Sequence, residues 1–292
     1  MKQKIIVNIF AAMLMLLTFS CSGIHNIDVP AQLDWKLPWQ EGDTFTLVRK
    51  LDLYITPAAF EMNENEWMKP TASSVITTYL GKVLNKDGDL TNMELCVESV
   101  TLKSTTSGIN QTMEYSKSRG LSGVSDDQIG EVKKKFERIY KVKINKQGCI
   151  ENYEGQIDMM GDLRGFARDP YSIFTYLLRE LPQGPMSDGA RWKTNAEIAI
   201  AHCGDKIKLD FNCRLKCGVV KDSRGGFGVD AEIRTSENSA QHLSMPEKII
   251  GNGKWWISPD FRYVSGETKF KIEHDGDVIV SWSDSVEVTP GN

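Results

Sequence analysis

The stretch KIKLDFNCRLKC at residues 206–217 alternates between polar and apolar side chains at every position. A period of two places all the apolar side chains on one face of a β-strand. On such a strand Cys213 and Cys217 lie about 13 Å apart, which is farther than the roughly 7 Å between Cα atoms that a disulfide allows. The stretch therefore predicts a half-buried strand whose two cysteines face the core and do not bond to each other.

Segments of similar character, rich in β-branched and aromatic residues, recur along most of the chain. They predict a mainly β (α+β) fold with one large antiparallel sheet, strongly curved or closed into a half-barrel, and two helices packed on it. The helices are expected from Ser125 to about Tyr140 and from Asp169-Pro170 to Pro182, where capping residues and a helical period coincide. The strands are expected at residues 43–53, 75–84, 93–102, 111–117, 139–145, 194–202, 206–217, 227–235, 261–272 and 278–282. Turn-forming dipeptides separate several strands: Asp87-Gly88, Gly204-Asp205, Gly225-Gly226 and Asp275-Gly276.

Hairpin-like segments occur in the same order in both halves of the chain, which predicts an internal duplication. GKVLNKDGD at 81–89 corresponds to GVVKDSRGG at 218–226, and KVKINKQGCI at 141–150 corresponds to KFKIEHDGDV at 269–278. The expected organisation is a first β repeat with the helices over 41–180 and a second β repeat over 181–292. The two halves are expected to form one continuous domain.

The first twenty residues have the layout of a secretory signal peptide. Two lysines precede an apolar run over 5–19, and the small residue Ser20 leads to Cys21. The apolar run is shorter than the roughly 20 residues that a membrane-spanning helix needs. LTFSC at 17–21 resembles the lipobox of bacterial lipoproteins. The resemblance implies that Cys21 becomes the first mature residue and carries acyl chains such as palmitate. Residues 22–40 show no clear period and contain two prolines, which predicts a tether that ends by docking Trp35 and Trp39 on the domain.

The lipobox implies a place in the bacterial cell envelope. Several acyl chains, at about 0.8 kcal/mol per buried methylene, hold a protein stably on a membrane. Ser22 after the cysteine, by resemblance to proteobacterial lipoproteins, implies the outer membrane, and no acidic run follows to direct the chain to the surface. We therefore expect a protein that faces the periplasm. The mature chain as a whole resembles two-repeat bacterial lipoproteins and, less closely, the half-barrels of periplasmic lipoprotein carriers, which enclose an apolar cavity.

The composition is ordinary for a globular protein, with 40% hydrophobic residues and a net charge of −4, so nucleic acid is not an expected partner. Neither a zinc-binding spacing nor an EF-hand loop is found, and no cofactor or metal is expected. The periplasm permits disulfides, but an odd number of cysteines follows Cys21, so at least one thiol stays free or pairs between molecules. The sequence leaves the pairing open among Cys96, Cys149, Cys203, Cys213 and Cys217.

Four aromatic residues are the candidates for a ligand site or its rim. Adjacent side chains of a strand point to opposite faces, so of Trp255 and Trp256 one is expected in the core and the other exposed or at a rim. Phe261 and Tyr263 lie near them in the sequence. No serine, cysteine or carboxylate motif makes any histidine a general base, so the chain is not expected to be an enzyme.

These patterns lead to one main hypothesis and two alternatives. The main hypothesis is a lipid-anchored, non-enzymatic envelope protein that binds a hydrophobic ligand in a β cavity. The first alternative is a solid-cored scaffold that binds another envelope protein. The second is a glycan-acting hydrolase, which would need two carboxylates about 5–10 Å apart in a cleft.

Overall fold

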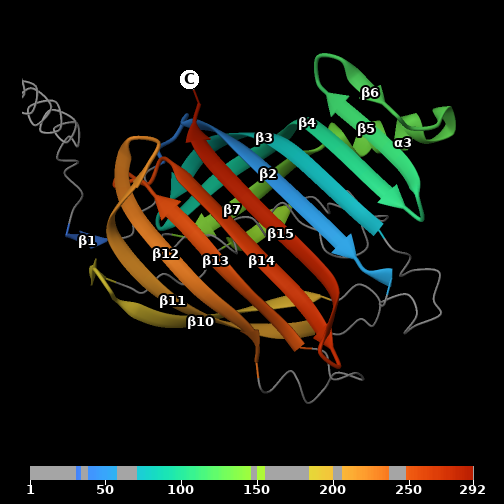
Figure 1. Ribbon diagram of the computed structural model, residues 1–292. Helices are drawn as coiled ribbons and strands as arrows, with labels where there is room; N and C mark the ends of the chain where they lie inside the picture. The colour runs from blue at the N-terminus through green and yellow to red at the C-terminus, as the bar shows by residue number, and fades with distance from the viewer. Residues whose placement is uncertain are drawn as a thin grey trace, which may run out of the picture.

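The computed structural model describes residues 31–33, 39–57, 71–145, 150–154, 184–199, 206–236 and 248–291. Most of them belong to one 13-stranded antiparallel sheet (Figure 1). The strands span Gln32–Leu33 (β1), Thr44–Ile55 (β2), Thr71–Asp87 (β3), Leu90–Thr106 (β4), Ile109–Ser116 (β5), Gly120–Ser122 (β6), Ile139–Asn145 (β7), Ile150–Glu154 (β8), Met186–Ser187 (β9), Arg191–Ala199 (β10), Lys206–Lys221 (β11), Arg224–Thr235 (β12), Lys248–Ile257 (β13), Val264–His274 (β14) and Asp277–Pro290 (β15).

The order of the strands makes a single, continuous, curved surface. It runs β10-β11-β12-β13-β14-β15-β2-β3-β4-β5-β6, with β7 and β8 attached to a second part of β4, while β1 and β9 form a separate pair. The pairing of β15 with β2 joins the second half of the chain to the first. In the described part of the chain β10 pairs with β11 alone, so the sheet stays open. The predicted fold class, mainly β with one large curved antiparallel sheet, is confirmed.

Each strand has an apolar face and a polar face, as the alternation predicts. On β2 the side chains of Phe45, Leu47, Leu51 and Leu53 are at most 5% exposed, whereas the residues between them are more accessible apart from Arg49 on the apolar side. We call the apolar side of the sheet the inner face and the opposite side the outer face. The inner-face side chains merge into one hydrophobic core across the sheet.

The turns agree with the sequence at some hairpins and differ at one. Gly88 and Gly276 have positive φ after β3 and β14, as the Asp-Gly dipeptides predict. The expected turn at Gly225-Gly226 is wrong, because both residues lie inside β12. The hairpin between β11 and β12 turns instead at Asp222 and Ser223, which adopt φ of 49° and 63°. The Gly204-Asp205 dipeptide lies outside the described residues.

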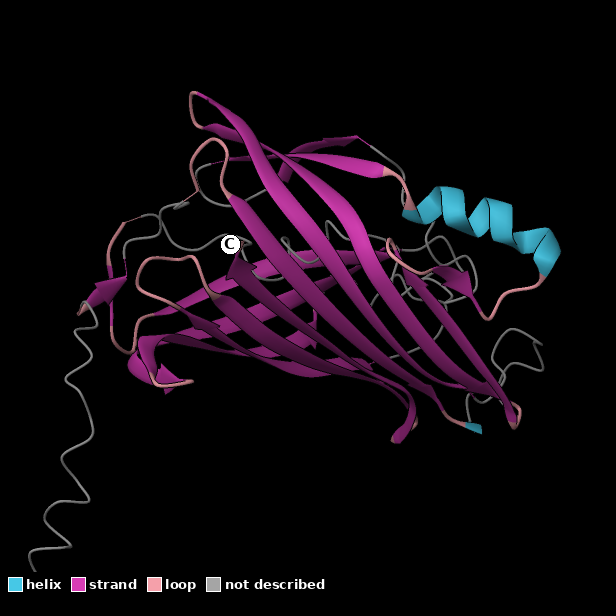
Figure 2. Cartoon of the chain, turned by 90° about the horizontal axis from the view of Figure 1, so that it is seen from above, coloured by secondary structure: helices cyan, strands magenta, loops and turns pink. Residues whose placement is uncertain are grey.

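The structure describes one helix, α3, over Asp126–Phe136. Ser125 is its N-cap residue in an extended conformation, and Phe136 packs on Tyr115 of β5 with ring centroids 4.9 Å apart. Figure 2 shows α3 at the margin of the sheet. The helix ends earlier than the predicted Tyr140, because Ile139 already begins β7. The second expected helix, 169–182, lies outside the described residues, and among those described no helix is long and apolar enough to cross a membrane.

The residues compared in the duplication hypothesis fall on hairpins in both halves. The first pair of segments spans the β3–β4 and β11–β12 connections, and the second pair spans β7–β8 and β14–β15. The surroundings differ, because β4 pairs directly with β7 whereas β13 lies between β12 and β14. The duplication itself stays a prediction.

Trp39 of the tether docks on the sheet as predicted, whereas Trp35 lies outside the described residues. The ring of Trp39 stacks on that of Phe45 at 4.8 Å and an interplanar angle of 4°, and Trp39 is 6% exposed. Gly81 lies opposite Phe45 on β3. A Cβ at Gly81 would lie 2.1 Å from the Phe45 ring, so the glycine leaves the space that this stack occupies.

The cysteines of β11 face the core, as predicted. Cys96, Cys213 and Cys217 are free, and Cys149 and Cys203 lie outside the described residues. Burial raises the pKa of the Cys213 thiol to about 12. Burial, followed by the charge of Asp188, also raises the pKa of Cys217.

The free thiols are expected to differ in reactivity. Only the thiolate attacks an alkylating reagent, and at pH 8 a thiol of pKa about 12 is ionised in about one molecule in ten thousand. We expect iodoacetamide to modify the partly exposed Cys96 in the folded protein and to reach Cys213 only after unfolding in urea. Peptide mass mapping at intervals measures both rates. Equal rates for the two thiols in the folded protein would contradict the burial of Cys213.

Candidate functional site

A groove with a volume of about 1100 Å³ crosses seven strands of the described part of the sheet. We call it the outer groove. Three consecutive residues of each strand line it, and the middle residue of each triplet belongs to the inner-face alternation. The flanking side chains therefore stand on the outer face as two parallel walls. The triplets are 250–252 (β13), 269–271 (β14), 281–283 (β15), 52–54 (β2), 72–74 (β3), 103–105 (β4) and 110–112 (β5).

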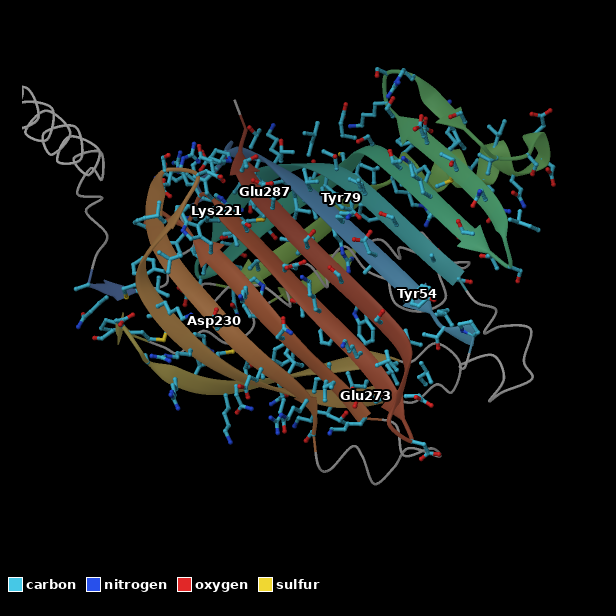
Figure 3. All side chains as sticks on the ribbon, viewed as in Figure 1. Tyr54, Tyr79, Lys221, Asp230, Glu273 and Glu287 are labelled. Atoms are coloured by element: carbon cyan, nitrogen blue, oxygen red, sulfur yellow. The ribbon has the colours of Figure 1, made fainter. Side chains whose placement is uncertain are left out.

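The strand register places each wall in a single row across the sheet. One row runs Asn252, Lys269, Ser283, Asp52, Ser74, Lys103, Thr112. The other row runs Ile250, Lys271, Ser281, Tyr54, Ala72, Thr105, Asn110. The walls are thus mostly hydroxyl, amide and charged groups. Tyr54 is the aromatic residue near their middle and is 49% exposed (Figure 3).

The charges of the outer groove are partly compensated by neighbours. Lys50 lies 2.8 Å from the carboxylate of Asp52, and Glu267 lies 3.0 Å from the ammonium group of Lys269. The two other lysines of the walls, Lys103 and Lys271, have no ion pair or hydrogen bond with any described residue. The groove therefore presents two uncompensated positive charges.

A smaller groove of about 640 Å³ crosses the outer face between β11 and β2. It carries charged groups of both signs, of which Lys216 forms an ion pair with Asp230. Lys221 donates a hydrogen bond to Ser265 across it. Figure 3 marks Lys221, Asp230 and Glu287 on this side of the sheet.

The four predicted aromatic residues do not gather in one site. Trp255 and Phe261 join the hydrophobic core, whereas Trp256 lies on the outer face and lines the smaller groove. The two tryptophans do point to opposite faces, but each is only 8% exposed. Tyr263 is half-buried beneath the guanidinium of Arg224, whose Cζ lies 3.9 Å from the ring centroid. Trp255 thus lies in the core, as expected, and Trp256 lines a groove on the opposite face but is buried there instead of exposed.

Trp256 is buried because its ring lies against the outer face of β12. Its Nε1 donates a hydrogen bond to the carbonyl of Val219 at 3.0 Å. The neighbouring position on β12 is Gly226, where a Cβ would lie 2.7 Å from the ring and 2.5 Å from the carbonyl oxygen of Ile257. The glycine thus supplies the close approach that the indole needs, instead of the predicted turn.

Substitution of Gly226 by alanine is expected to lower the free energy of unfolding by about 1–3 kcal/mol, because the new methyl group overlaps backbone as well as the indole. Urea unfolding, followed by tryptophan fluorescence, measures the change. Gly130→Ala in α3 is the matched control, because nothing lies within 4 Å of its Cβ position. It is expected to leave stability unchanged or raise it by up to about 1 kcal/mol. A Gly226→Ala protein as stable as wild type would refute the packing described above.

Phe261 reaches the core through a constrained loop. It has a φ of 57°, a region that non-glycine residues seldom occupy. Its backbone N–H donates to the carbonyl of Ser258 at 2.9 Å, and the Ser258 hydroxyl accepts from the N–H of Tyr263 at 3.0 Å. These bonds hold the loop between β13 and β14 so that the Phe261 ring is 8% exposed.

One ion pair lies on the inner face, among mostly apolar side chains. Arg49 of β2 donates from Nε to Oδ1 of Asp284 on β15 at 2.9 Å, and its Nη2 donates to Oδ2 of the same carboxylate. The two side chains are 8% and 13% exposed. Thr77, opposite Arg49, and Thr268, opposite Asp284, are also buried. The pair thus forms a polar centre within the apolar face.

Among the described residues, no three histidine, cysteine, aspartate or glutamate side chains gather in a way that could hold a metal ion. The residues that the structure adds to the predicted sites are Arg49, Asp284, Tyr54, Lys103 and Lys271. Only Arg49 has a sequence signal, because it occupies an inward position between Leu47 and Leu51 in the alternating strand 43–53. Cys21 lies outside the described residues.

Comparison with known proteins gives no family. No family model matches the chain, and no curated protein matches it. One solved structure, described as "Lipid-protein interactions in lipovitellin", aligns with 87% of this chain at 8% sequence identity and a TM-score of 0.45. The alignment covers 25% of the lipovitellin chain, so the present chain spans about a quarter of the length of that chain. The chain is therefore placed in no family by these comparisons.

Proposed function

We propose that the protein is a lipid-anchored protein of the bacterial envelope that binds a hydrophobic ligand against the inner face of its sheet. The anchor is Cys21 of the lipobox, and the domain faces the periplasm from the outer membrane. The observation that carries the proposal is the inner face itself, which is mostly apolar across the open sheet; its buried exceptions include the Arg49–Asp284 pair and a few serine and threonine side chains. No catalytic role is assigned to any residue.

The part of the inner face best suited to an apolar ligand lies around Trp282. Its ring stacks on Phe270 with centroids 4.6 Å apart, and Leu53 lies opposite it on β2. The described residues outside the large sheet that join the core are Leu33, Trp39, Phe136, Met186 and Phe261. Trp39 and Phe261 contact the other end of the strands, near Phe45 and after Ile257. The Trp282 end is therefore where we place the ligand.

Burial sets a condition on how the ligand enters. Phe270, Leu53 and Trp282 are 3%, 5% and 8% exposed. A ligand that reaches them must displace the groups that already cover them, and it gains about 0.8 kcal/mol for each methylene that it buries. A long acyl chain provides enough methylenes for this exchange, whereas a small apolar molecule does not.

Native mass spectrometry with solvent extraction tests the proposal on the exported chain from residue 24 onward, which lacks Cys21 and its lipid. A co-purifying hydrophobic molecule of defined mass, or uptake of added fatty acid, is the expected result. Uptake should also change the fluorescence of Trp282. The change that is lost in the Trp282→Phe variant is the part of the fluorescence signal that comes from Trp282. A clean apo mass with no uptake of added lipids would reject the hydrophobic ligand.

A scaffold that binds another envelope protein is the second candidate. Large apolar side chains are exposed on the outer face, namely Ile76 at 41% on β3, Leu80 at 42% on β3 and Ile139 at 54% on β7. Leu80 and Ile139 lie on either side of Cys96 in the strand register. In that case, envelope crosslinking through a photoreactive residue at Ile139 would capture one defined protein, and the same probe at exposed Lys216 would not.

The anchor has its own test. Cys21→Ser is expected to release the protein from the membrane fraction and to abolish incorporation of radiolabelled palmitate. Retention of the variant in the outer-membrane fraction would show that the lipid is not what holds the protein there.

A further inference from the structure

We propose that the outer groove binds an acidic glycan chain, a ligand distinct from the hydrophobic one and on the opposite face of the sheet. Three properties of the groove lead to this ligand class. They are its length, the chemistry of its walls and the position of its two uncompensated lysines.

The length of the groove calls for an extended ligand. The lining residues come from seven adjacent strands, and strands lie about 4.8 Å apart, so the groove is about 29 Å long. Its walls stay in register across all seven strands, without a strand missing from the row. A chain molecule that lies across the strands fills such a groove, whereas a compact small molecule occupies only part of it.

The chemistry of the walls is that of a carbohydrate site. Hydroxyl and amide groups recur along both walls, and Tyr54, half-exposed in one of them, presents a ring on which the C–H face of a sugar can stack. The Asp52 carboxylate, which lies 2.8 Å from the ammonium group of Lys50, can accept hydrogen bonds from sugar hydroxyls. The Thr105 hydroxyl donates to Oδ1 of Asn110 at 2.6 Å, which leaves the amide nitrogen of Asn110 as a donor.

The two uncompensated lysines make the expected glycan acidic. Lys271 on β14 and Lys103 on β4 lie on opposite walls, each two strands away from Tyr54 on β2. At about 4.8 Å per strand they lie about 19 Å apart along the groove. One glycan chain with carboxylate or phosphate groups several sugars apart meets both lysines and the tyrosine between them.

Isothermal titration of the full-length, lipidated protein tests this proposal. A polyoxyethylene detergent is used, because maltoside headgroups would compete for a sugar site. The probes are oligogalacturonates from dimer to hexamer, with malto-oligosaccharides of equal length as neutral counterparts and polyphosphate as an anion without sugar rings. We expect the hexagalacturonate to bind, the neutral hexamer to bind at least tenfold more weakly, and affinity to fall as salt rises.

Variants then locate the binding. Lys103→Ala/Lys271→Ala is expected to weaken hexagalacturonate binding about tenfold, with little effect on the dimer, which is too short to bridge the two lysines. The matched control is Lys82→Ala/Lys143→Ala, which removes the same charge from exposed positions outside the groove and should change affinity less than about twofold. Tyr54→Ala should weaken binding about fivefold, and Tyr54→Phe should restore it.

Three results would overturn the proposal. The first is equal binding of acidic and neutral oligomers. The second is an equal loss of affinity in the two double-lysine variants, which would mean a diffuse charge effect. The third is polyphosphate binding as tight as that of hexagalacturonate and insensitive to Tyr54→Ala, which would make the groove a simple anion site. Circular dichroism of each variant confirms that the exposed substitutions leave the sheet intact.

Discussion

Substitution of Arg49 by methionine is expected to lower the free energy of unfolding by about 3–5 kcal/mol. Arg49 and Asp284 are 8% and 13% exposed, and together they form a two-point contact within an apolar face. Methionine nearly fills the volume of the arginine but leaves the Asp284 carboxylate buried without its partner. Breaking a buried pair in this way destabilises strongly because an uncompensated charge remains. Urea unfolding at fixed pH and salt measures the difference.

The double variant Arg49→Met/Asp284→Leu separates the loss of a partner from the value of the pair. Removing both charges in favour of apolar groups is often neutral or stabilising, so most of the lost stability should return. Raised salt should change the wild-type stability little, because a buried pair is poorly screened. If Arg49→Met alone were as stable as wild type, water would have to reach Asp284, and the inner face would not be closed at this point.

The fold class follows from the sequence wherever side chains alternate. The segment 139–145 coincides with β7, and the strand predicted at 206–217 continues as β11 to Lys221, past a bulge between Cys217 and Val219. The period of two settles which side of each strand is buried before any partner strand is known. It does not settle the ends, because a hairpin extends as far as both strands find partners. For this reason β15 runs to Pro290, although the pattern predicted an end at 282.

The strand β13 was missed because its sequence is typical of a loop. Gly251, Asn252 and Gly253 interrupt the apolar pattern in the middle of the strand. A Cβ at Gly253 would lie 2.2 Å from the ring of Trp255, and one at Gly251 would lie 2.9 Å from the ring of Phe270. The glycines are therefore places where large rings of the core cross the strand. A single sequence cannot distinguish such a glycine from one in a turn, since both need a missing side chain.

The outer groove could not have been found from the sequence. Its walls combine residues from seven strands between positions 52 and 283, and their alignment depends on the register of every pair between β13 and β5. A slip of one residue in any pair would move its side chains to the other face. Bulges at Thr78/Tyr79 and Ile272/Glu273 also shift the register. By contrast, the position of Arg49 in an alternating strand already marked an inward charge.

Substitution of Trp282 by alanine is expected to have the other large effect, a loss of about 3–5 kcal/mol. Trp282 is 8% exposed and stacks on Phe270 with ring centroids 4.6 Å apart, and alanine would leave most of the indole volume empty. The neighbouring strands hold the backbone in place on both sides, so the site has little freedom to collapse. Trp282→Phe should lose less, because a ring still meets Phe270.

The control for Trp282→Ala is Ser283→Ala on the same strand. Its side chain points to the outer face, and substitutions at such sites usually change stability by no more than about 0.5 kcal/mol. Urea unfolding of the three variants, together with fatty-acid uptake, separates folding from binding. A cavity lined by apolar groups favours apolar guests, so Trp282→Ala should be less stable yet take up a fatty acid at least as readily as wild type. Reduced uptake in a folded variant would instead make the indole itself a contact of the ligand, whereas unchanged stability would show that Trp282 is not packed in the core.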